Sequence, residues 1–185
     1  LNGIFAFAIW DKSKSRLWLV RDPLGIKPLF YSDGNGKIVF ASEVPALFHF
    51  PSLSREPDLF GMDTFFTFGY VPAPMTGHKA IRQLLPGEYL LIQNGKKTFK
   101  KYWDLPLGVS KHKESEQELL EEFSRLLKQA VESQMVSDVP LGAFLSSGTD
   151  SFAIVQAMQQ VNQGRTTAFS MGFNNKKFDE LDNTR

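Results

Sequence analysis

The sequence has no cysteine among its 185 residues. Disulfide bonds, thiolate metal ligands and a cysteine nucleophile are therefore excluded within this stretch of chain. The absence is compatible with a cytoplasmic protein, and that is the location we expect. The histidines His49, His78 and His112 lie far apart in the sequence. Their spacing matches no metal-ligand motif, so a zinc site is not expected.

Net charge and long apolar runs are lacking too. The 21 Lys and Arg residues almost balance the 20 Asp and Glu residues, which leaves a formal charge of +1. This balance favours neither nucleic acid nor an anionic membrane as a partner. No apolar run approaches the roughly 20 residues that span a bilayer, and no signal-peptide pattern opens the chain. The chain begins and ends close to strand-like runs, so we expect it to be a fragment of a longer protein.

The first part of the sequence has the pattern of an antiparallel β structure. Residues 2–10 are apolar at nearly every position, which predicts a central strand covered on both faces, with residues 16–21 as its antiparallel neighbour. Two hairpins are predicted around Asp33-Gly-Asn-Gly36 and around Asn94-Gly95. Loose helical spacing over residues 57–68 predicts a short helix.

The second part has the pattern of an α/β structure. After a polar linker, Ser115 and Glu118 form a capping box, and apolar residues at helical spacing predict a helix as far as Met135. A short buried strand at 141–145, a helix at 150–162 and a strand at 167–173 then make a βαβ unit. We therefore predict two incomplete domains, residues 1–105 and residues 106–185.

The turn that joins this strand and helix is a candidate anion site. Ser146 to Thr149 would aim backbone N–H groups and the positive end of a helix dipole at one spot, which suits a phosphate. The segment lacks the lysine of a Walker loop, so a P-loop kinase or GTPase is not expected. Asp150 would either cap the helix or meet a Mg²⁺ ion that accompanies the phosphates. The alternative is an ordinary strand–turn–helix connection with Ser and Asp as caps.

The same stretch carries a resemblance to a known family. Ser137 to Ser151 reads S-D-V-P-L-G-A-F-L-S-S-G-T-D-S. It resembles the pyrophosphate loop of glutamine-hydrolysing asparagine synthetases, which usually reads S-D-V-P-x-G-x-x-L-S-G-G-L-D-S-S. The chain departs from this pattern at Ser147, Thr149 and Phe152. Ser147 adds a Cβ where the backbone is expected to approach the pyrophosphate, so Ser147→Gly should strengthen nucleotide binding.

The resemblance extends over nearly the whole chain. Segments 1–11, 21–29 and 40–43 resemble the second half of a class II glutamine amidotransferase domain. Three later segments favour the asparagine synthetase branch, namely Phe68-Gly-Tyr-Val-Pro-Ala-Pro74, Leu85-Pro-Gly-Glu-Tyr89 and Tyr102-Trp-Asp104. The resemblance implies an α+β to α/β two-domain fragment. It would hold the C-terminal part of an antiparallel Ntn-type glutaminase sandwich and the start of a parallel α/β adenine-nucleotide hydrolase-like domain.

The resemblance also implies a function, ATP-dependent amidation of aspartate with ammonia taken from glutamine. The products would be asparagine, AMP and pyrophosphate, formed through a β-aspartyl adenylate, and the resemblance also allows a homodimer. The family's nucleophilic cysteine lies upstream of the matched segment, so we expect no catalytic residue here and no activity from this fragment alone. The implied ATP-binding residues are Leu145, Ser146, Ser147, Gly148, Asp150, Ser151 and Met171, with Asp150 as the Mg²⁺ ligand. Two alternatives stay open, an amidotransferase acting on another carboxylate and a catalytically inactive remnant.

Several residues have a structural interpretation beside the functional one. Leu145 and Met171 would be sheet core if they did not line an adenine pocket. Arg21 and Asp22 are interpreted as a charge pair that fixes the turn at Pro23-Leu-Gly25, with Lys27 nearby, in preference to glutamine ligands. Ser42 is expected to cap a helix with Glu43 as its dipole partner, and Asp179-Glu180 is either the family's acidic pair or a solvated loop. The phenylalanines at 60, 65, 66 and 68 are expected in the core.

Overall fold

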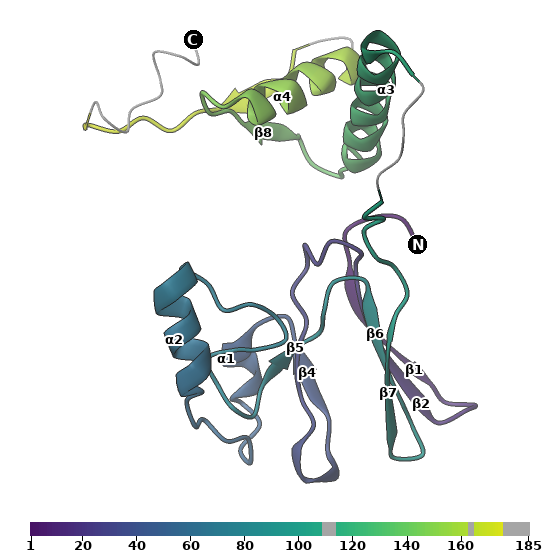
Figure 1. The fold of residues 1–185 in the computed structure, drawn as a ribbon, viewed down its shortest axis with the longest axis vertical. Coiled ribbons are helices and arrows are strands. Elements are labelled where there is room, and N and C mark those ends of the chain that lie inside the picture. The colour runs from purple at the N-terminus through teal and green to yellow at the C-terminus, as the bar shows by residue number, and fades with distance from the viewer. Residues whose placement is uncertain (109–113, 163–164, 176–185) are drawn as a thin grey trace. The chain divides into compact units, whose positions relative to one another are not determined.

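The computed structural model describes residues 1–108, 114–162 and 165–175, and the chain divides into two compact units, Leu1–Gly108 and Val109–Arg185 (Figure 1). Within the described ranges, no helix combines the length and the apolar character needed to cross a membrane. All three tryptophans, Trp10, Trp18 and Trp103, belong to the first unit.

The larger sheet of the first unit is antiparallel throughout, in the order β1-β2-β6-β7. It consists of β1 (Ala6–Asp11), β2 (Arg16–Arg21), β6 (Glu88–Gln93) and β7 (Lys96–Lys101). The predicted pairing of β1 with β2 is confirmed, as is the hairpin at Asn94-Gly95, where both residues have a positive φ (51° and 73°) as a type I′ turn requires.

The prediction that the first strand is central is wrong for the described chain. β1 lies at the edge of its sheet, and the side chains of Ile9 and Trp10 are 53% and 56% exposed. The apolar pattern predicts that a strand is buried. It does not identify the segment that packs against the strand.

A smaller sheet, in the order β4-β3-β5, completes the core of this unit. Its strands are β3 (Phe30–Ser32), β4 (Val39–Ala41) and β5 (Arg82–Gln83), and the predicted hairpin turn contains a 3₁₀ helix, η1 (Gly34–Gly36). Leu19 and Leu90 of the large sheet pack with Tyr31 of the small one and with Leu29 and Leu84. The core therefore joins the two sheets.

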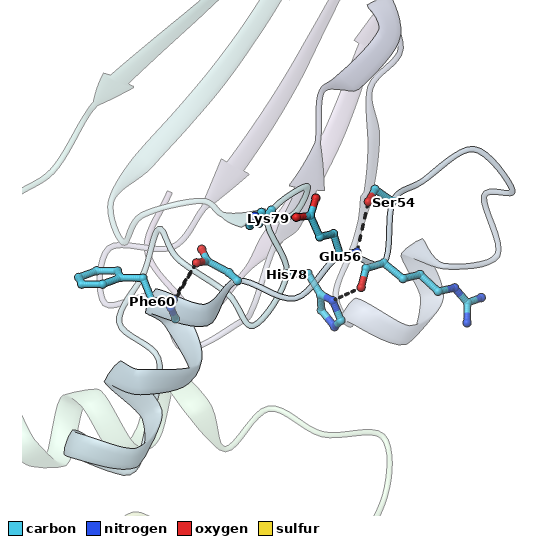
Figure 2. Close-up of polar contacts among 8 residues, drawn as sticks. Ser54, Glu56, Phe60, His78 and Lys79 are labelled. Atoms are coloured by element: carbon cyan, nitrogen blue, oxygen red, sulfur yellow. Dashed lines mark hydrogen bonds and ion pairs between the residues drawn. The ribbon is translucent and has the colours of Figure 1, made fainter.

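Two helices follow β4 in the chain, α1 (Val44–Leu47) and α2 (Leu59–Phe68). The expectation that Ser42 caps α1 is wrong, because the N-cap is Glu43 and its side chain makes no capping hydrogen bond. Helix α2 begins at Asp58, whose carboxylate accepts hydrogen bonds from the backbone N–H groups of Phe60 (3.2 Å, Figure 2) and Gly61 (3.4 Å). Gly69 ends the helix in the left-handed conformation that favours glycine.

The phenylalanines of α2 do not form core in the described structure, so that expectation is wrong. The side chains of Phe60, Phe65, Phe66 and Phe68 are between 49% and 79% exposed. Buried positions of the helix are instead taken by the small residues Gly61 and Thr64. A Cβ on Gly61 would collide with the backbone carbonyl of Thr76, which accounts for glycine there.

The second unit contains the predicted βαβ arrangement. Helix α3 (Glu116–Gln134) is followed by β8 (Gly142–Phe144), α4 (Thr149–Asn162) and β9 (Thr167–Phe169). β8 and β9 pair in parallel, and the capping box of Ser115 and Glu118 is present. Buried Val131 of α3 packs with Ala157 and Met158 of α4, with half-buried Ala143 of β8 against them. Figure 1 shows β8 beside α4.

Strand β8 is covered on one face only. Ala143 points toward the helices, whereas Phe144 is 85% exposed, because successive side chains of a strand point to opposite faces. The prediction of a buried strand is therefore wrong for the described residues, although the strand itself is confirmed.

Candidate functional site

The turn between β8 and α4 is closed by two serine hydroxyls. Ser146 Oγ and Ser151 Oγ lie 2.9 Å apart, and the backbone N–H of Ser146 donates to Ser151 Oγ at 3.1 Å. The N–H of Gly148 donates to Ser146 Oγ at 3.2 Å, and the Ser151 hydroxyl lies within donor distance of the Ser146 and Gly148 carbonyl oxygens. N–H and O–H donors therefore converge at the start of α4, where the helix dipole is positive. Such donors suit an anion.

A pocket of about 370 Å³ opens beside this turn. Its lining combines the two serines with apolar side chains. The lining residues are Phe144, Leu145, Ser146, Ser151, Phe169, Met171 and Phe173.

The structure therefore brings together four of the residues predicted for ATP, Leu145, Ser146, Ser151 and Met171. Ser147, Gly148 and Asp150 lie on the same turn and helix start but outside the pocket lining. Sequence reasoning missed the three phenylalanines of the lining. Their position at or just beyond the ends of the paired strands was the signal that could have found them, because the carboxyl ends of parallel strands meet at one edge of a sheet.

Ser170 was also missed. Its Oγ donates to the carbonyl oxygen of Leu145 at 2.9 Å, and the N–H of Leu145 donates to the carbonyl oxygen of Phe169 at 2.8 Å. The segment that follows β9 therefore holds the residue that immediately precedes the serine turn. The two polar groups of one backbone position are both satisfied in this way.

Ser147 does not have a positive φ. Across the described ranges only Ser15 and Asn94 are non-glycine residues with a positive φ, so Ser147 does not occupy a conformation reserved for glycine. A positive φ is therefore not a reason for the family's glycine to be favoured here. Close approach of a ligand to the added Cβ is the reason that remains.

A metal at this turn would have Asp150 as its protein ligand. The described part of the chain contains no group of three or more His, Asp or Glu side chains able to hold a metal ion by themselves. Asp150 lies exposed in the first turn of α4. A single carboxylate fits Mg²⁺, which is often held by one or two carboxylates together with substrate phosphates and waters.

Arg21 anchors the turn after β2, as the structural interpretation predicts. Its guanidinium donates to the carbonyl oxygens of Lys27 (2.9 Å), Gly25 (2.6 Å) and Leu84 (2.6 Å). Burial lowers the pKa of this guanidinium from its ordinary value, although the neighbouring carboxylate of Asp22 opposes the shift. The side chain is therefore committed to the backbone of the turn, and a role in binding glutamine is not supported by its contacts.

Asp22 holds the same turn from the other side. Its carboxylate accepts from the backbone N–H groups of Leu24 (3.2 Å), Ile26 (3.0 Å) and Lys27 (2.9 Å). Burial raises the pKa of this carboxyl, but the backbone donors, chiefly Lys27 and Ile26, outweigh it and leave the pKa below its ordinary value. Arg21 and Asp22 thus fix the turn through separate backbone bonds, and Lys27 takes part through its main chain.

Among the remaining candidates, His78 and His49 have different surroundings. His78 Nδ1 lies 3.3 Å from the carbonyl oxygen of Arg55 (Figure 2), and the imidazole ring packs edge-on against Phe48. His49 lines a separate surface pocket with Pro45, Phe48 and Arg55. His112 and the Asp179-Glu180 pair lie outside the described residues.

Both units match known protein families. Residues 1–103 match the model of a glutamine amidotransferase domain, and residues 122–185 match the model of asparagine synthase. Asparagine synthetase [glutamine-hydrolyzing] 3 of Bacillus subtilis is 37% identical over 155 residues, which is 83% of this chain and 25% of the relative. Asparagine synthetase [glutamine-hydrolyzing] 1 of the same organism is 36% identical over 183 residues, 98% of this chain and 28% of the relative.

A third relative is the putative asparagine synthetase [glutamine-hydrolyzing] 2 of Methanocaldococcus jannaschii. It is 33% identical over 182 residues, which is 97% of this chain and 35% of the relative. The chain thus spans between a quarter and about a third of the length of these relatives. The two family models follow one another in the same order as the two units. The chain therefore belongs to the family of glutamine-hydrolysing asparagine synthetases.

Proposed function

We propose that the chain is part of a synthetase that amidates aspartate with ammonia from glutamine at the expense of ATP. In this proposal residues 1–105 belong to the glutaminase domain and residues 106–185 begin the ATP-pyrophosphatase domain. The observation that carries it is the pocket beside the serine turn, which is lined by Ser146 and Ser151 together with the apolar residues Leu145 and Met171.

The polar and apolar residues of the lining suit the phosphates and the adenine base of ATP. The N–H groups of Ser146 and Gly148 now bond to serine hydroxyls, and these contacts would be exchanged for phosphate oxygens on binding. The apolar side chains would cover the adenine base, since nucleotide sites combine an apolar wall with a few placed polar groups. Asp150 would hold Mg²⁺, which supplies positive charge against the phosphates.

The turn would act at the departing pyrophosphate. In the proposed reaction the side-chain carboxylate of aspartate attacks the α-phosphorus of ATP, the bond to the β-phosphate oxygen breaks, and pyrophosphate leaves. Donors fixed at the position of the leaving group stabilise its charge as it develops. Ammonia from glutamine would then displace AMP from the β-aspartyl adenylate and give asparagine.

The test is ATP–pyrophosphate exchange by the full-length protein, with and without aspartate. We expect exchange that depends on aspartate and falls at least about tenfold in Ser146→Ala and Ser151→Ala, because each removes a donor from the turn. Ser133→Ala is the matched control, since its hydroxyl donates to the Ala130 carbonyl within α3. Nucleotide binding without aspartate-dependent exchange would refute aspartate as the acceptor. No affinity for Mg-ATP would refute the turn as a phosphate site and leave an inactive remnant.

Ser147→Gly tests how closely the phosphates approach the turn. We expect a lower Kd for Mg-ATP in the full-length protein, because the change removes a Cβ and a hydroxyl beside the proposed phosphate site. Isothermal titration calorimetry measures it. An unchanged or higher Kd would contradict the proposed close approach.

A further inference from the structure

Ser170 contacts the backbone at the point where β8 enters the serine turn. Its hydroxyl donates to the Leu145 carbonyl oxygen at 2.9 Å across 25 residues of sequence. The Leu145 N–H, on the other side of the same residue, donates to the Phe169 carbonyl oxygen at 2.8 Å. The last strand pair is Phe144 with Phe169, so the Ser170 hydroxyl adds a side-chain bond where the ladder of backbone bonds ends.

The Leu145 carbonyl and the Ser146 N–H belong to one peptide group. That group is planar, and in the trans form its C=O and N–H point in opposite directions. A bond that fixes the carbonyl therefore fixes the direction of the Ser146 N–H. This N–H points at Ser151 Oγ and is one of the donors of the proposed phosphate site.

The bond also gives the Leu145 carbonyl oxygen a hydrogen-bond donor beside the pocket. Leu145 and Ser146 both line this pocket. A carbonyl oxygen free to turn toward the pocket would present partial negative charge to an anion, whereas an oxygen that accepts from Ser170 is held away from that role.

We propose that Ser170 is a positioning residue for the anion-binding turn, acting through the peptide group that joins Leu145 to Ser146. The inference rests on the proposed function of the turn. It concerns the donors proposed for phosphate and not the apolar lining, and this difference makes it testable.

The experiment measures the Kd of the full-length protein for Mg-ATP and for magnesium pyrophosphate by calorimetry. We expect Ser170→Ala to raise the Kd for both ligands by a similar factor of roughly threefold to tenfold, the range for one side-chain hydrogen bond. Ser170→Thr keeps the hydroxyl and should restore both Kd values to within about twofold of the native protein.

Two control variants separate positioning from general damage. Ser133→Ala removes a serine hydroxyl that also donates to a backbone carbonyl, but within α3, and should change neither Kd. Met171→Ala removes an apolar lining side chain. It should raise the Kd for Mg-ATP and leave the Kd for magnesium pyrophosphate unchanged. A Ser170→Ala variant that weakened Mg-ATP alone, or neither ligand, would overturn the inference while the proposed function stands.

Hydrogen exchange of the ligand-free protein gives a readout that needs no nucleotide. Ser170→Ala should speed exchange of the Ser146 amide and leave the α3 amides unchanged, because only the peptide group at the turn loses its anchor. If the native protein bound neither ligand, the proposed function would fail and the role of Ser170 in binding with it. Unchanged exchange at Ser146 would in addition refute the anchoring itself.

Discussion

Gly25, in the turn after β2, has a φ of +66°, and a Cβ there would lie 2.7 Å from Pro86 Cγ and 3.0 Å from Arg21 Cζ. Gly36 has a similar φ of +70° but open space around the Cβ position. Gly36→Ala should therefore cost only the backbone strain, about 1 kcal/mol. Gly25→Ala should cost about 1–3 kcal/mol more, because it also displaces the guanidinium that holds the turn. Urea unfolding followed by tryptophan fluorescence measures the difference, and equal losses would contradict the proposed crowding.

Asp22 makes the stability of the same turn depend on pH. Its carboxyl pKa is lower in the folded protein than in the unfolded chain, where it is about 3.9. The ionised group therefore stabilises the fold above that value, and the contribution is lost as the pH falls through the folded pKa. Asp22→Asn should cost about 1–3 kcal/mol at pH 7 through weaker acceptors, and the deficit should shrink below about pH 4. Urea unfolding at pH 7, 5, 4 and 3 tests this, and a constant deficit down to pH 3 would disprove it.

The sequence predicted that Arg21 and Asp22 fix a turn, but it could not predict how. Pro23 and Gly25 are local signals of a turn and can be recognised in isolation. The bond from Arg21 to the carbonyl oxygen of Leu84 spans 63 residues, and no local pattern encodes such a contact. The expected pairing of the two charges is replaced by separate bonds to the backbone.

At the level of elements, the beginning of α2 depends on Asp58. Asp58→Ala removes the acceptor for the N–H groups of Phe60 and Gly61 and should cost about 1 kcal/mol. Asp63→Ala is the matched control, because it removes the same charge from the interior of the same helix and should change stability by less than about 0.5 kcal/mol. Urea unfolding of the two variants compares them. Equal losses would show that charge, and not capping, sets the effect.

Elements with local sequence signals were predicted well, but the burial of their apolar faces was not. Asn94-Gly95 fixed a hairpin because both positions need a positive φ, and Ser115 with Glu118 fixed the start of α3. The apolar faces of β1 and α2 were expected to be buried, yet they are exposed here. The hydrophobic pattern indicates which faces favour burial, whereas actual burial depends on which other segments pack against those faces.

At the level of the whole molecule, the candidate site was predicted in part. The motif around Ser146 and Ser151 was recognisable, since a strand, a turn and a helix follow one another in the sequence. Met171 was assigned to the site by family resemblance, and in the structure it lines the same pocket as Leu145. Ser170 and the phenylalanines of the lining were missed, because they reach the site only through the parallel pairing of β8 with β9.

The distribution of tryptophan allows the two units to be followed by different spectroscopic signals. Indole emission originates wholly from Leu1–Gly108, where the ring centroids of Trp18 and Tyr89 lie 4.9 Å apart with the rings tilted by 56°. The longest helices of the described residues, α3 and α4, belong to Val109–Arg185. Emission and far-ultraviolet circular dichroism at 222 nm therefore report chiefly on different units. During heating we expect the two signals to change at different temperatures, because each unit has its own hydrophobic cluster. Superimposable melting curves would mean that the chain unfolds as one cooperative body.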